Sequence, residues 1–325
     1  MTTHATADAE TSTWPRTVTV IGAAGLIGAG VVEGLALSDA ADTICLTDLR
    51  ENVLQAHAID ISEAQILAGT DRARLAVGEE TAPDEVDLVI VAASAPETPD
   101  GDRRDFLRDN LQLLRKITPS IERLAGAEGI VMLLSNPVDI LCEALRRTSS
   151  VTPDRIVGYS VNDSIRLRAA IGRVLGVSGA RVGGLVLGEH GDGQVPLWDN
   201  ITVDGAPYEL DAEQRRLVQE DILGWFARWS ALKPGRSSGW TTPRGVVADI
   251  GSMSAGTPHP ACVWTGGIES VADSFITLPT VMEHGRIRPA DDALAVSSEV
   301  RQGLEKAAES VAVAAADALA DLPTA

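Results

Sequence analysis

A β-branched run that ends in a cluster of glycines constrains the fold of this 325-residue chain more than any other feature. Residues 17–21 read TVTVI and residues 22–28 read GAAGLIG. A buried strand, a glycine turn and the helical period of residues 26–37 predict a strand–turn–helix unit. In such a unit the first glycine permits a tight turn. The second lets the backbone approach a pyrophosphate, and the third lets helix and strand pack closely.

An acidic residue follows the next predicted strand, residues 43–46. Asp48 lies about 20 residues after the last glycine, the spacing typical of a dinucleotide site. An acid there accepts hydrogen bonds from the adenosine ribose and repels a 2′-phosphate, so we expect NAD rather than NADP as the cofactor. The alternative is a strand–turn–helix junction without a ligand. The expected cofactor-binding residues of the turn are Gly22, Gly25, Leu26, Ile27 and Gly28.

Strand-like and helical patterns alternate along the first half of the chain. This alternation predicts βαβ units and the α/β class, a Rossmann-type doubly wound parallel sheet followed by an α+β substrate-binding and catalytic domain. The division expected is a disordered tail (1–16), an NAD-binding domain (17–157) and a catalytic domain (158–325). Further strands are expected at 73–77, 87–91, 129–133, 156–159, 181–187, 262–265 and 274–281. Further helices are expected at 51–67, 103–124, 137–147, 161–175, 212–232 and 246–253 and over the Ala-rich C-terminal segment, with Asn136 as the cap of the helix at 137–147.

The charge balance excludes two classes of partner. A net charge of −19 argues against nucleic acid and against anionic membranes, since both require a basic surface. Cys45, Cys142 and Cys262 form no C-x-x-C pair, so reduced, buried thiols are expected and no metal site is predicted. The first 13 residues carry neither a basic segment nor an apolar one, and the expected location is the cytoplasm.

Four polar segments have no evident structural purpose. They are RRDF at 103–106, NPVD at 136–139, NDSIR at 162–166 and GEHGD at 188–192. In this order, after the glycine turn, they resemble the lactate/malate dehydrogenase family over nearly the whole chain. The resemblance implies a reversible, NAD-dependent hydride transfer between a small 2-oxo acid and the 2-hydroxy acid.

The resemblance also implies a role for each polar residue. His190 would exchange a proton with the substrate oxygen, a task that suits a group titrating near neutrality. Asp163 would orient His190, and Arg166, three residues later on the same helix, would bind the C1 carboxylate through a planar fork. Arg103 would close over the site and polarise the carbonyl. Asn136 would position the carbonyl or the nicotinamide amide, and Thr241 would shape the far side of the substrate.

The loop before Arg103 departs from the family pattern. In the malate dehydrogenases of the family that this chain resembles, an arginine lies six residues before the position of Arg103. This chain has Glu97 there. Two carboxylates ~4 Å apart repel each other by about 4 kcal/mol at an effective dielectric constant near 20. We therefore expect a neutral-polar or cationic substrate side chain. The alternatives are a Glu97 that points to solvent, a one-residue loop difference that shifts the register, and an ordinary malate or lactate dehydrogenase.

Several other expectations stay open at this level. Asn162 replaces a leucine of the family and either makes the site more polar or bonds to the backbone. If Arg244 reached the pocket, an oxo acid with a second anionic group, such as a dicarboxylate or a phosphorylated acid, would again be possible. The tryptophans of 225–229 belong either to an interface or to a core-facing stripe, in a protein expected to be a homodimer or homotetramer. An NAD-dependent glycosidase and a silent NAD-binding protein are the other function classes. Chelator-sensitive activity would favour the glycosidase. Retention of all four residues, His190, Asp163, Arg166 and Arg103, argues against a silent protein.

Overall fold

One large sheet runs through the computed structural model, which describes residues 14–78, 84–96, 103–232, 239–293 and 295–320. Within these residues eleven strands join in the order β3-β2-β1-β4-β5-β6-β12-β13-β8-β9, with β14 added to β13. The first six are parallel to one another and the rest pair antiparallel. The parallel strands are β1 (Thr17–Ile21), β2 (Thr43–Thr47), β3 (Arg74–Val77), β4 (Leu88–Val91), β5 (Ile130–Leu133) and β6 (Ile156–Gly158). The others are β8 (Val186–Gly188), β9 (Gln194–Pro196), β12 (His259–Trp264), β13 (Phe275–Glu283) and β14 (Arg286–Pro289).

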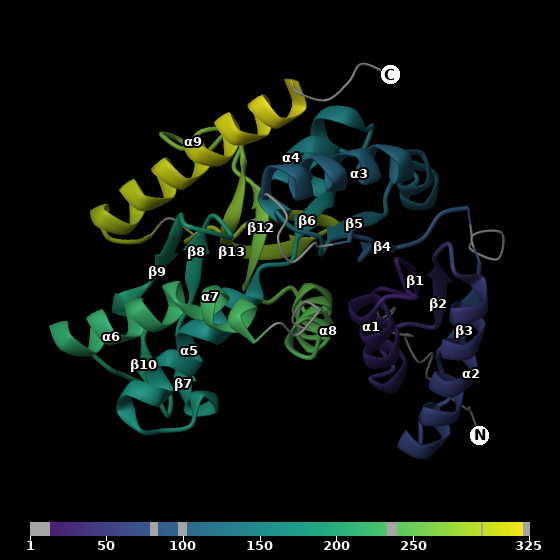
Figure 1. Cartoon of the computed structure of the whole chain (residues 1–325), viewed down its shortest axis with the longest axis horizontal. Coiled ribbons are helices and arrows are strands. Elements are labelled where there is room, and N and C mark those ends of the chain that lie inside the picture. Colours follow the sequence, from purple (N-terminus) through teal and green to yellow (C-terminus); the bar gives the residue numbers. More distant parts are fainter. Residues whose placement is uncertain (1–13, 79–83, 97–102, 233–238, 294, 321–325) are drawn as a thin grey trace, which may run out of the picture.

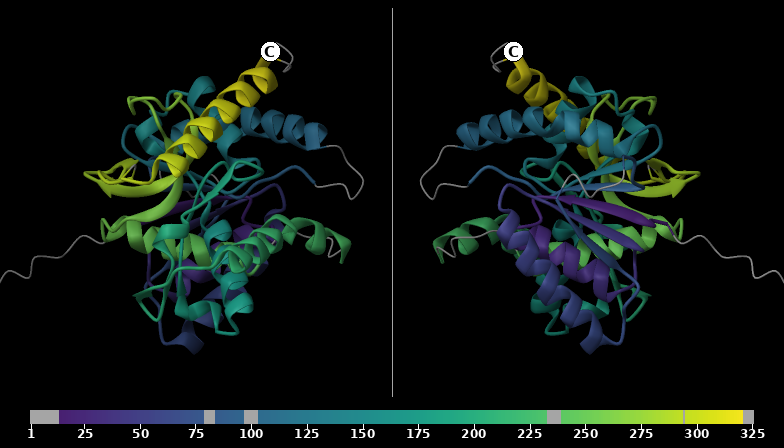
Figure 2. Two further views of the ribbon diagram at one scale, coloured as in Figure 1. Left: turned by 90° about the vertical axis from the view of Figure 1, so that its left-hand side faces the viewer. Right: turned by 90° about the vertical axis from the view of Figure 1, so that its right-hand side faces the viewer.

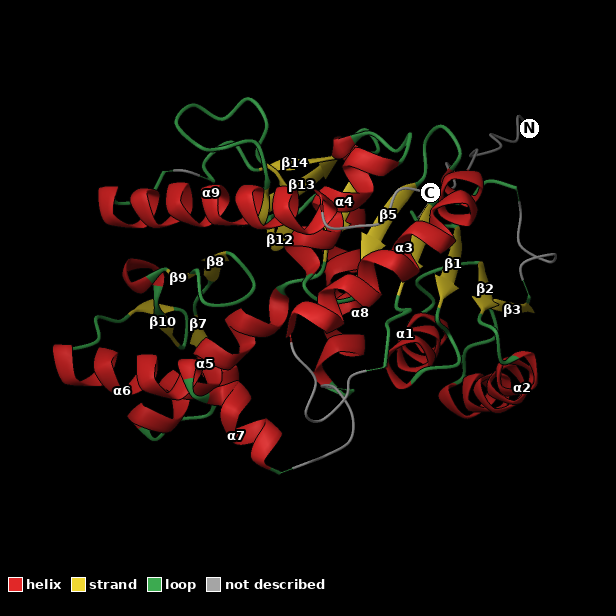
Figure 3. Cartoon of the chain, turned by 45° about the horizontal axis from the view of Figure 1, so that its top comes forward, coloured by secondary structure: helices red, strands yellow, loops and turns green. Residues whose placement is uncertain are grey.

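Helices cover both faces of this sheet, as Figures 1 and 2 show. One face carries α3 (Arg103–Ala125), α4 (Val138–Thr148) and α9 (Ser298–Ala320). The other carries α1 (Leu26–Leu37), α2 (Glu51–Ala68) and α8 (Thr241–Ser254). At one end of the molecule α5 (Val161–Leu175), α6 (Ala212–Leu223) and α7 (Trp225–Ala231) lie together (Figure 3), next to a small sheet of β7 (Val182–Gly183), β10 (Thr202–Val203) and β11 (Ala206–Pro207). The predicted doubly wound α/β fold is confirmed.

The alternation of side chains explains why the central strands are apolar throughout. Ile90 and Met132 point into the core beneath α1 and α8, whereas Val89 and Val131 point into the core beneath α3 and α4. Because both faces are covered, every residue of β4 and β5 is buried. A run of this kind is typical of parallel strands.

Several expected boundaries are wrong. The helix expected at 212–232 is two helices separated by Gly224, and the strand expected at 181–187 is split into β7 and β8. The helix expected near 246–253 already begins at Thr241. The short strands β9, β10, β11 and β14 were not anticipated, since each has only two to four residues and is too short to show a period of its own.

The N-terminal tail ends earlier than expected. Residues 1–13 lie outside the described part of the chain, but Pro15 is buried and Trp14 packs against the main core. The backbone N–H of Arg16 donates to Asp87, which fixes the start of β1. The expected domain boundary, between residues 157 and 158, falls inside β6 and stays a prediction.

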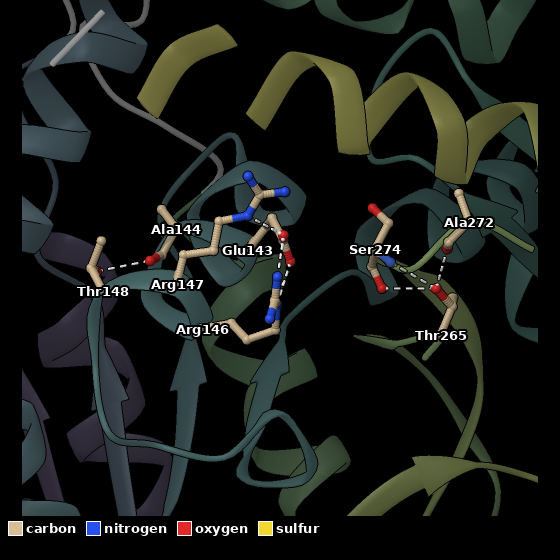
Figure 4. Close-up of polar contacts among 8 residues, drawn as sticks. All are labelled: Glu143, Ala144, Arg146, Arg147, Thr148, Thr265, Ala272 and Ser274. Atoms are coloured by element: carbon tan, nitrogen blue, oxygen red, sulfur yellow. Dashed lines mark hydrogen bonds and ion pairs between the residues drawn. The ribbon is translucent and has the colours of Figure 1, made fainter. Parts of the chain in front are cut away.

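A buried ion cluster anchors α4 (Figure 4). The carboxylate of Glu143 is fully buried and accepts hydrogen bonds from Arg146 and Arg147 of the same helix, at 2.5–2.9 Å. The Arg146 guanidinium lies over the ring of Trp264, 4.4 Å from its centroid. Nearby, Thr265 donates to two backbone carbonyls between β12 and β13 and accepts from the N–H of Ser274. The contact with Trp264 joins α4 to β12, and the hydrogen bonds of Thr265 join the end of β12 to the segment before β13.

A substitution in the glycine turn tests the packing of α1 on β1. A Cβ at Gly28 would lie 2.3 Å from the carbonyl oxygen of Gly22, whereas a Cβ at Gly251 in α8 meets nothing within 4 Å. We expect Gly28→Ala to lower the free energy of unfolding by about 1–3 kcal/mol, because two backbone segments must separate. The control Gly251→Ala should raise it by about 0.5–1 kcal/mol, the gain of alanine over glycine inside a helix. Urea unfolding measures both, and equal stabilities for Gly28→Ala and the parent would contradict this packing.

Candidate functional site

The glycine turn forms a compact cradle at the carboxyl end of β1. Gly22 has φ +91°, and a Cβ there would lie 2.5 Å from the backbone of Ala93 on the neighbouring chain segment. Gly25 is the N-cap of α1, with Leu26 and Ile27 in the first turn and no acidic side chain there to neutralise the helix dipole. Free N–H groups at a helix start attract a phosphate. The turn therefore fits the pyrophosphate of a dinucleotide.

Asp48 closes the other side of this cradle. One of its carboxylate oxygens accepts from the N–H of Ala24 at 3.3 Å, and the other accepts from the backbone N–H of Arg50 at 3.1 Å. The side chain of Arg50 also pairs with Asp48, at 3.3 Å. The structure thus brings Asp48 to the glycine turn, as the spacing in the sequence predicts.

Asn136 lies in the loop that leaves the carboxyl end of β5. Its side chain is exposed, and the neighbouring Ser135 donates to the carbonyl of Ala93 at 2.5 Å, which joins this loop to the end of β4. The expectation that Asn136 caps the next helix is wrong. The N-cap of α4 is Pro137, and its first helical residue is Val138. The amide of Asn136 is thereby left without a capping role.

A tight loop after β8 presents His190. Gly188 has φ +83°, and a Cβ there would lie 2.6 Å from the carbonyl oxygen of Gly193, so a side chain would break the turn. The backbone N–H of His190 donates to the buried carboxylate of Asp139 at 2.9 Å. Asp139 also accepts from the thiol of Cys262 at 3.2 Å. A carboxylate on α4 therefore sets the position of the loop.

The ring of His190 meets the carboxylate of Asp163 on α5. Nδ1 lies 2.5 Å from one oxygen, and the other oxygen accepts from Nη1 of Arg166 at 2.9 Å. Only 5% of the Asp163 side chain is exposed, against 16% for His190 and 23% for Arg166. The structure thus brings together Asp163, Arg166 and His190, although His190 lies 27 positions after Asp163 in the sequence.

The charges of this cluster determine the pKa values. Burial alone lowers the pKa of His190, but the carboxylate of Asp163 outweighs it and raises this pKa above its ordinary value. Burial raises the pKa of Asp163, but His190 and Arg166 outweigh it and hold that pKa low. Burial also raises the pKa of Asp139. Burial likewise raises the pKa of Glu189, the residue before His190 in the loop.

Trp225 on α7 covers the guanidinium of Arg166. The Cζ atom of Arg166 lies 3.7 Å from the ring centroid, a cation–π contact. Trp225 also stacks on Trp229, with the two centroids 5.4 Å apart and the planes at 12°. Both tryptophans are partly buried. The contact with Arg166 is one that neither reading of these tryptophans in the sequence anticipated.

Asn162 bridges two elements instead of bonding to the backbone. Its amide oxygen accepts from the hydroxyl of Tyr159 at 2.9 Å, and its amide nitrogen donates to Thr242 at 2.9 Å. All three side chains are buried. Asn162 thus fixes the start of α8 against α5. Thr241, the residue expected near the substrate, is exposed beside this joint.

Two expected residues cannot be placed. Glu97 lies outside the described residues, and of Arg103 only the position at the start of α3 is described. Arg244 is exposed on α8, three residues after Thr241.

The sequence analysis assigned no role in the site to Asp139 or Trp225. In the structure Asp139 contacts His190, and Trp225 contacts Arg166. The only signals were an acid in the first turn of α4 and an aromatic pair spaced i, i+4.

The comparisons with known proteins agree with this geometry. The model of the lactate/malate dehydrogenase NAD-binding domain matches residues 16–158, and that of the α/β C-terminal domain matches residues 162–228. Malate dehydrogenase of Thermomicrobium roseum is 28% identical over 91% of this chain and 96% of its own length. L-lactate dehydrogenase B of Hordeum vulgare is 33% identical over 81% of this chain and 79% of its own.

Solved structures share the fold. Malate dehydrogenase of Cryptosporidium parvum has a TM-score of 0.82 at 22% identity, over 94% of this chain and 99% of that one. Malate dehydrogenase of Salinibacter ruber has a TM-score of 0.79 at 25% identity, over 94% and 97%. Within the described residues, no helix has the length and apolar character that crossing a bilayer requires. The chain belongs to the lactate/malate dehydrogenase family and is an NAD-dependent 2-hydroxy-acid dehydrogenase.

Proposed function

We propose that His190, Asp163 and Arg166 carry out the reversible reduction of a 2-oxo acid by NADH at this site. The observation that carries the proposal is the single buried carboxylate of Asp163, which binds the ring of His190 with one oxygen and the guanidinium of Arg166 with the other. In reduction, a 2-oxo acid, NADH and one proton give a 2-hydroxy acid and NAD⁺. NADH supplies the hydride to the carbonyl carbon.

The residues of the chain supply the rest. Reduction leaves negative charge on the former carbonyl oxygen, and protonated His190 neutralises it by donating from Nε2, because Nδ1 is held by Asp163. The N–H groups of Arg166 that do not contact Asp163 bind the C1 carboxylate. Arg103 would polarise the carbonyl, Asn136 would orient the carbonyl or the nicotinamide amide, and Thr241 would border the substrate. In oxidation, neutral His190 is the base.

The cofactor preference follows from Asp48. A carboxylate beside the glycine turn accepts hydrogen bonds from ribose hydroxyls and repels a 2′-phosphate. Gly22, Gly25, Leu26, Ile27 and Gly28 would hold the pyrophosphate through backbone N–H groups. This explains how a chain with a net charge of −19 can bind an anionic cofactor.

The raised pKa of His190 gives a pH dependence with a defined sign. Reduction needs the protonated ring, so kcat/KM for the oxo acid should be maximal below the pKa of His190 and fall as the pH rises through it, above about 6.5. Asp163→Asn removes the group that raises this pKa, and the fall should move to lower pH. His190→Ala should lower kcat by about 10²–10⁴-fold while NADH still binds. The exposed His284 provides the control, since His284→Ala should leave the profile unchanged. An unshifted profile in Asp163→Asn would contradict the assignment.

Glu97 sets the proposed substrate class. Its position relative to Arg103 motivates a 2-oxo acid with a neutral-polar or cationic side chain, because a carboxylate at ~4 Å would oppose a second substrate carboxylate by about 4 kcal/mol at an effective dielectric constant near 20. Arg244 supports the opposite case, a dicarboxylate or phosphorylated oxo acid, if its exposed side chain reaches the substrate. Ordinary malate or lactate dehydrogenase activity is the simplest alternative.

A steady-state panel of 2-oxo acids with NADH distinguishes these cases. We expect oxaloacetate to be a poor substrate and Glu97→Arg to raise its kcat/KM by at least tenfold, since the repulsion becomes an attraction. Glu309→Arg makes the same charge change on the exposed face of α9 and should have no such effect. Oxaloacetate as the best substrate of the parent by a wide margin would refute the proposed class.

We also propose that the protein is cytoplasmic and that each chain divides into two domains, residues 17–157 and 158–325. In solution the protein would form a homodimer or a homotetramer. Exposed apolar side chains on α2 support the association, since Ile59, Ile66 and Leu67 are 65%, 75% and 91% exposed. Sedimentation equilibrium should give two or four times the chain mass, and Ile59→Glu with Ile66→Glu should lower it. A monomer at micromolar concentration would contradict this proposal.

A further inference from the structure

The contact between Trp225 and Arg166 joins two elements that the catalytic residues alone do not connect. Arg166 comes from α5 and Trp225 from α7, and the guanidinium carbon lies 3.7 Å from the centroid of the indole ring. The second tryptophan, Trp229, follows one helical turn later and stacks on the first. The surface offered to Arg166 is thus a pair of parallel rings rather than one mobile side chain.

Asp163 alone does not fix the plane of the Arg166 guanidinium. It accepts from Nη1 only, and a group held at one nitrogen can still turn about that bond. A carboxylate binds an arginine best when two parallel N–H groups point at its two oxygens, which requires a fixed plane. The indole face supplies the missing constraint, because a guanidinium stacks flat on an aromatic ring.

The helix that carries Trp225 is itself tied to α5. Arg228 of α7 donates to the backbone carbonyl of Asp221 at 2.9 Å and pairs with its carboxylate. Arg173, on the same helix as Arg166, donates to that carboxylate at 2.8 Å. One aspartate therefore connects α7 with α5, and the distance between Trp225 and Arg166 depends on this connection.

We propose that Trp225 is a positioning residue that fixes the plane of Arg166 for the C1 carboxylate of the substrate, with Trp229 supporting it from the next turn. The inference rests on the proposed role of Arg166. It predicts that Trp225 governs the affinity for the oxo acid and leaves the affinity for NADH untouched, because the glycine turn and Asp48 belong to other elements. The chemical step at His190 should depend on Trp225 much less than substrate binding does.

The test is a double-mutant cycle on Trp225 and Arg166. We expect Trp225→Leu to raise KM for the best oxo acid of the panel about tenfold, with kcat changed less than threefold and the Kd of NADH unchanged. Trp225→Phe keeps a flat aromatic face and should recover most of the loss. In an Arg166→Lys background the same Trp225→Leu change should raise KM no more than twofold, because an ammonium group has no plane to fix. The control is Tyr208→Leu, which removes an exposed aromatic ring outside this cluster and should leave KM unchanged.

The outcomes separate this inference from the proposed function. If Arg166→Lys leaves KM and kcat within twofold of the parent, the proposed role of Arg166 fails, and the inference fails with it. If Arg166→Lys is strongly impaired while Trp225→Leu matches the parent, only the inference about Trp225 is overturned. Equal effects of Trp225→Leu and Trp225→Phe, or equal effects of Trp225→Leu in both backgrounds, also overturn it. Should Trp225→Leu fold poorly, Trp225→Phe and Trp229→Leu are compared instead, and a rise in KM with Trp229→Leu alone supports the stack.

Discussion

The buried carboxylate of Asp163 is the interaction on which the site depends. Out of water an isolated negative charge is strongly disfavoured, and His190 and Arg166 compensate it. Each of them contacts one oxygen of Asp163, so a single side chain fixes the proposed acid–base group and the proposed carboxylate-binding group relative to one another. Asp139 is a second buried carboxylate that contacts His190. It accepts a hydrogen bond from the backbone N–H of His190, whereas Asp163 contacts the ring.

Net charge and local charge act at different distances in this protein. The chain carries many more acids than bases, yet both of its anionic ligands have defined places in the proposal. In that proposal, backbone N–H groups at the start of α1 bind the cofactor and arginines bind the substrate. Exposed charges separated by more than a Debye length are largely screened, whereas partly buried contacts are screened much less. Local contacts of this kind therefore allow a chain with a high net negative charge to bind a dinucleotide.

Local patterns in the sequence predicted the parts of the fold that are determined locally. The glycine turn, the apolar strands and α5, with the bounds 161–175, needed only periodicity and glycine chemistry. Boundaries failed where a strand is too short to show a period, as for β14, or where one residue interrupts a continuous pattern, as Gly224 does between α6 and α7. The same distinction holds in the site. Asp163 and Arg166 share a helix face and were predicted as a pair, whereas Trp225 approaches Arg166 from a separate helix that no sequence period connects to α5.

Gly158 has a consequence for how the two parts of the sheet join. It lies in β6, where the parallel and antiparallel parts of the sheet join, paired with Leu133 on one side and Cys262 on the other. A Cβ there would lie 2.6 Å from Val138 of α4 and 2.9 Å from Cys262 of β12. Any larger side chain at residue 158 would therefore push α4 or β12 away from β6. The alignment between the parallel and the antiparallel part of the sheet thus depends on a glycine at this position.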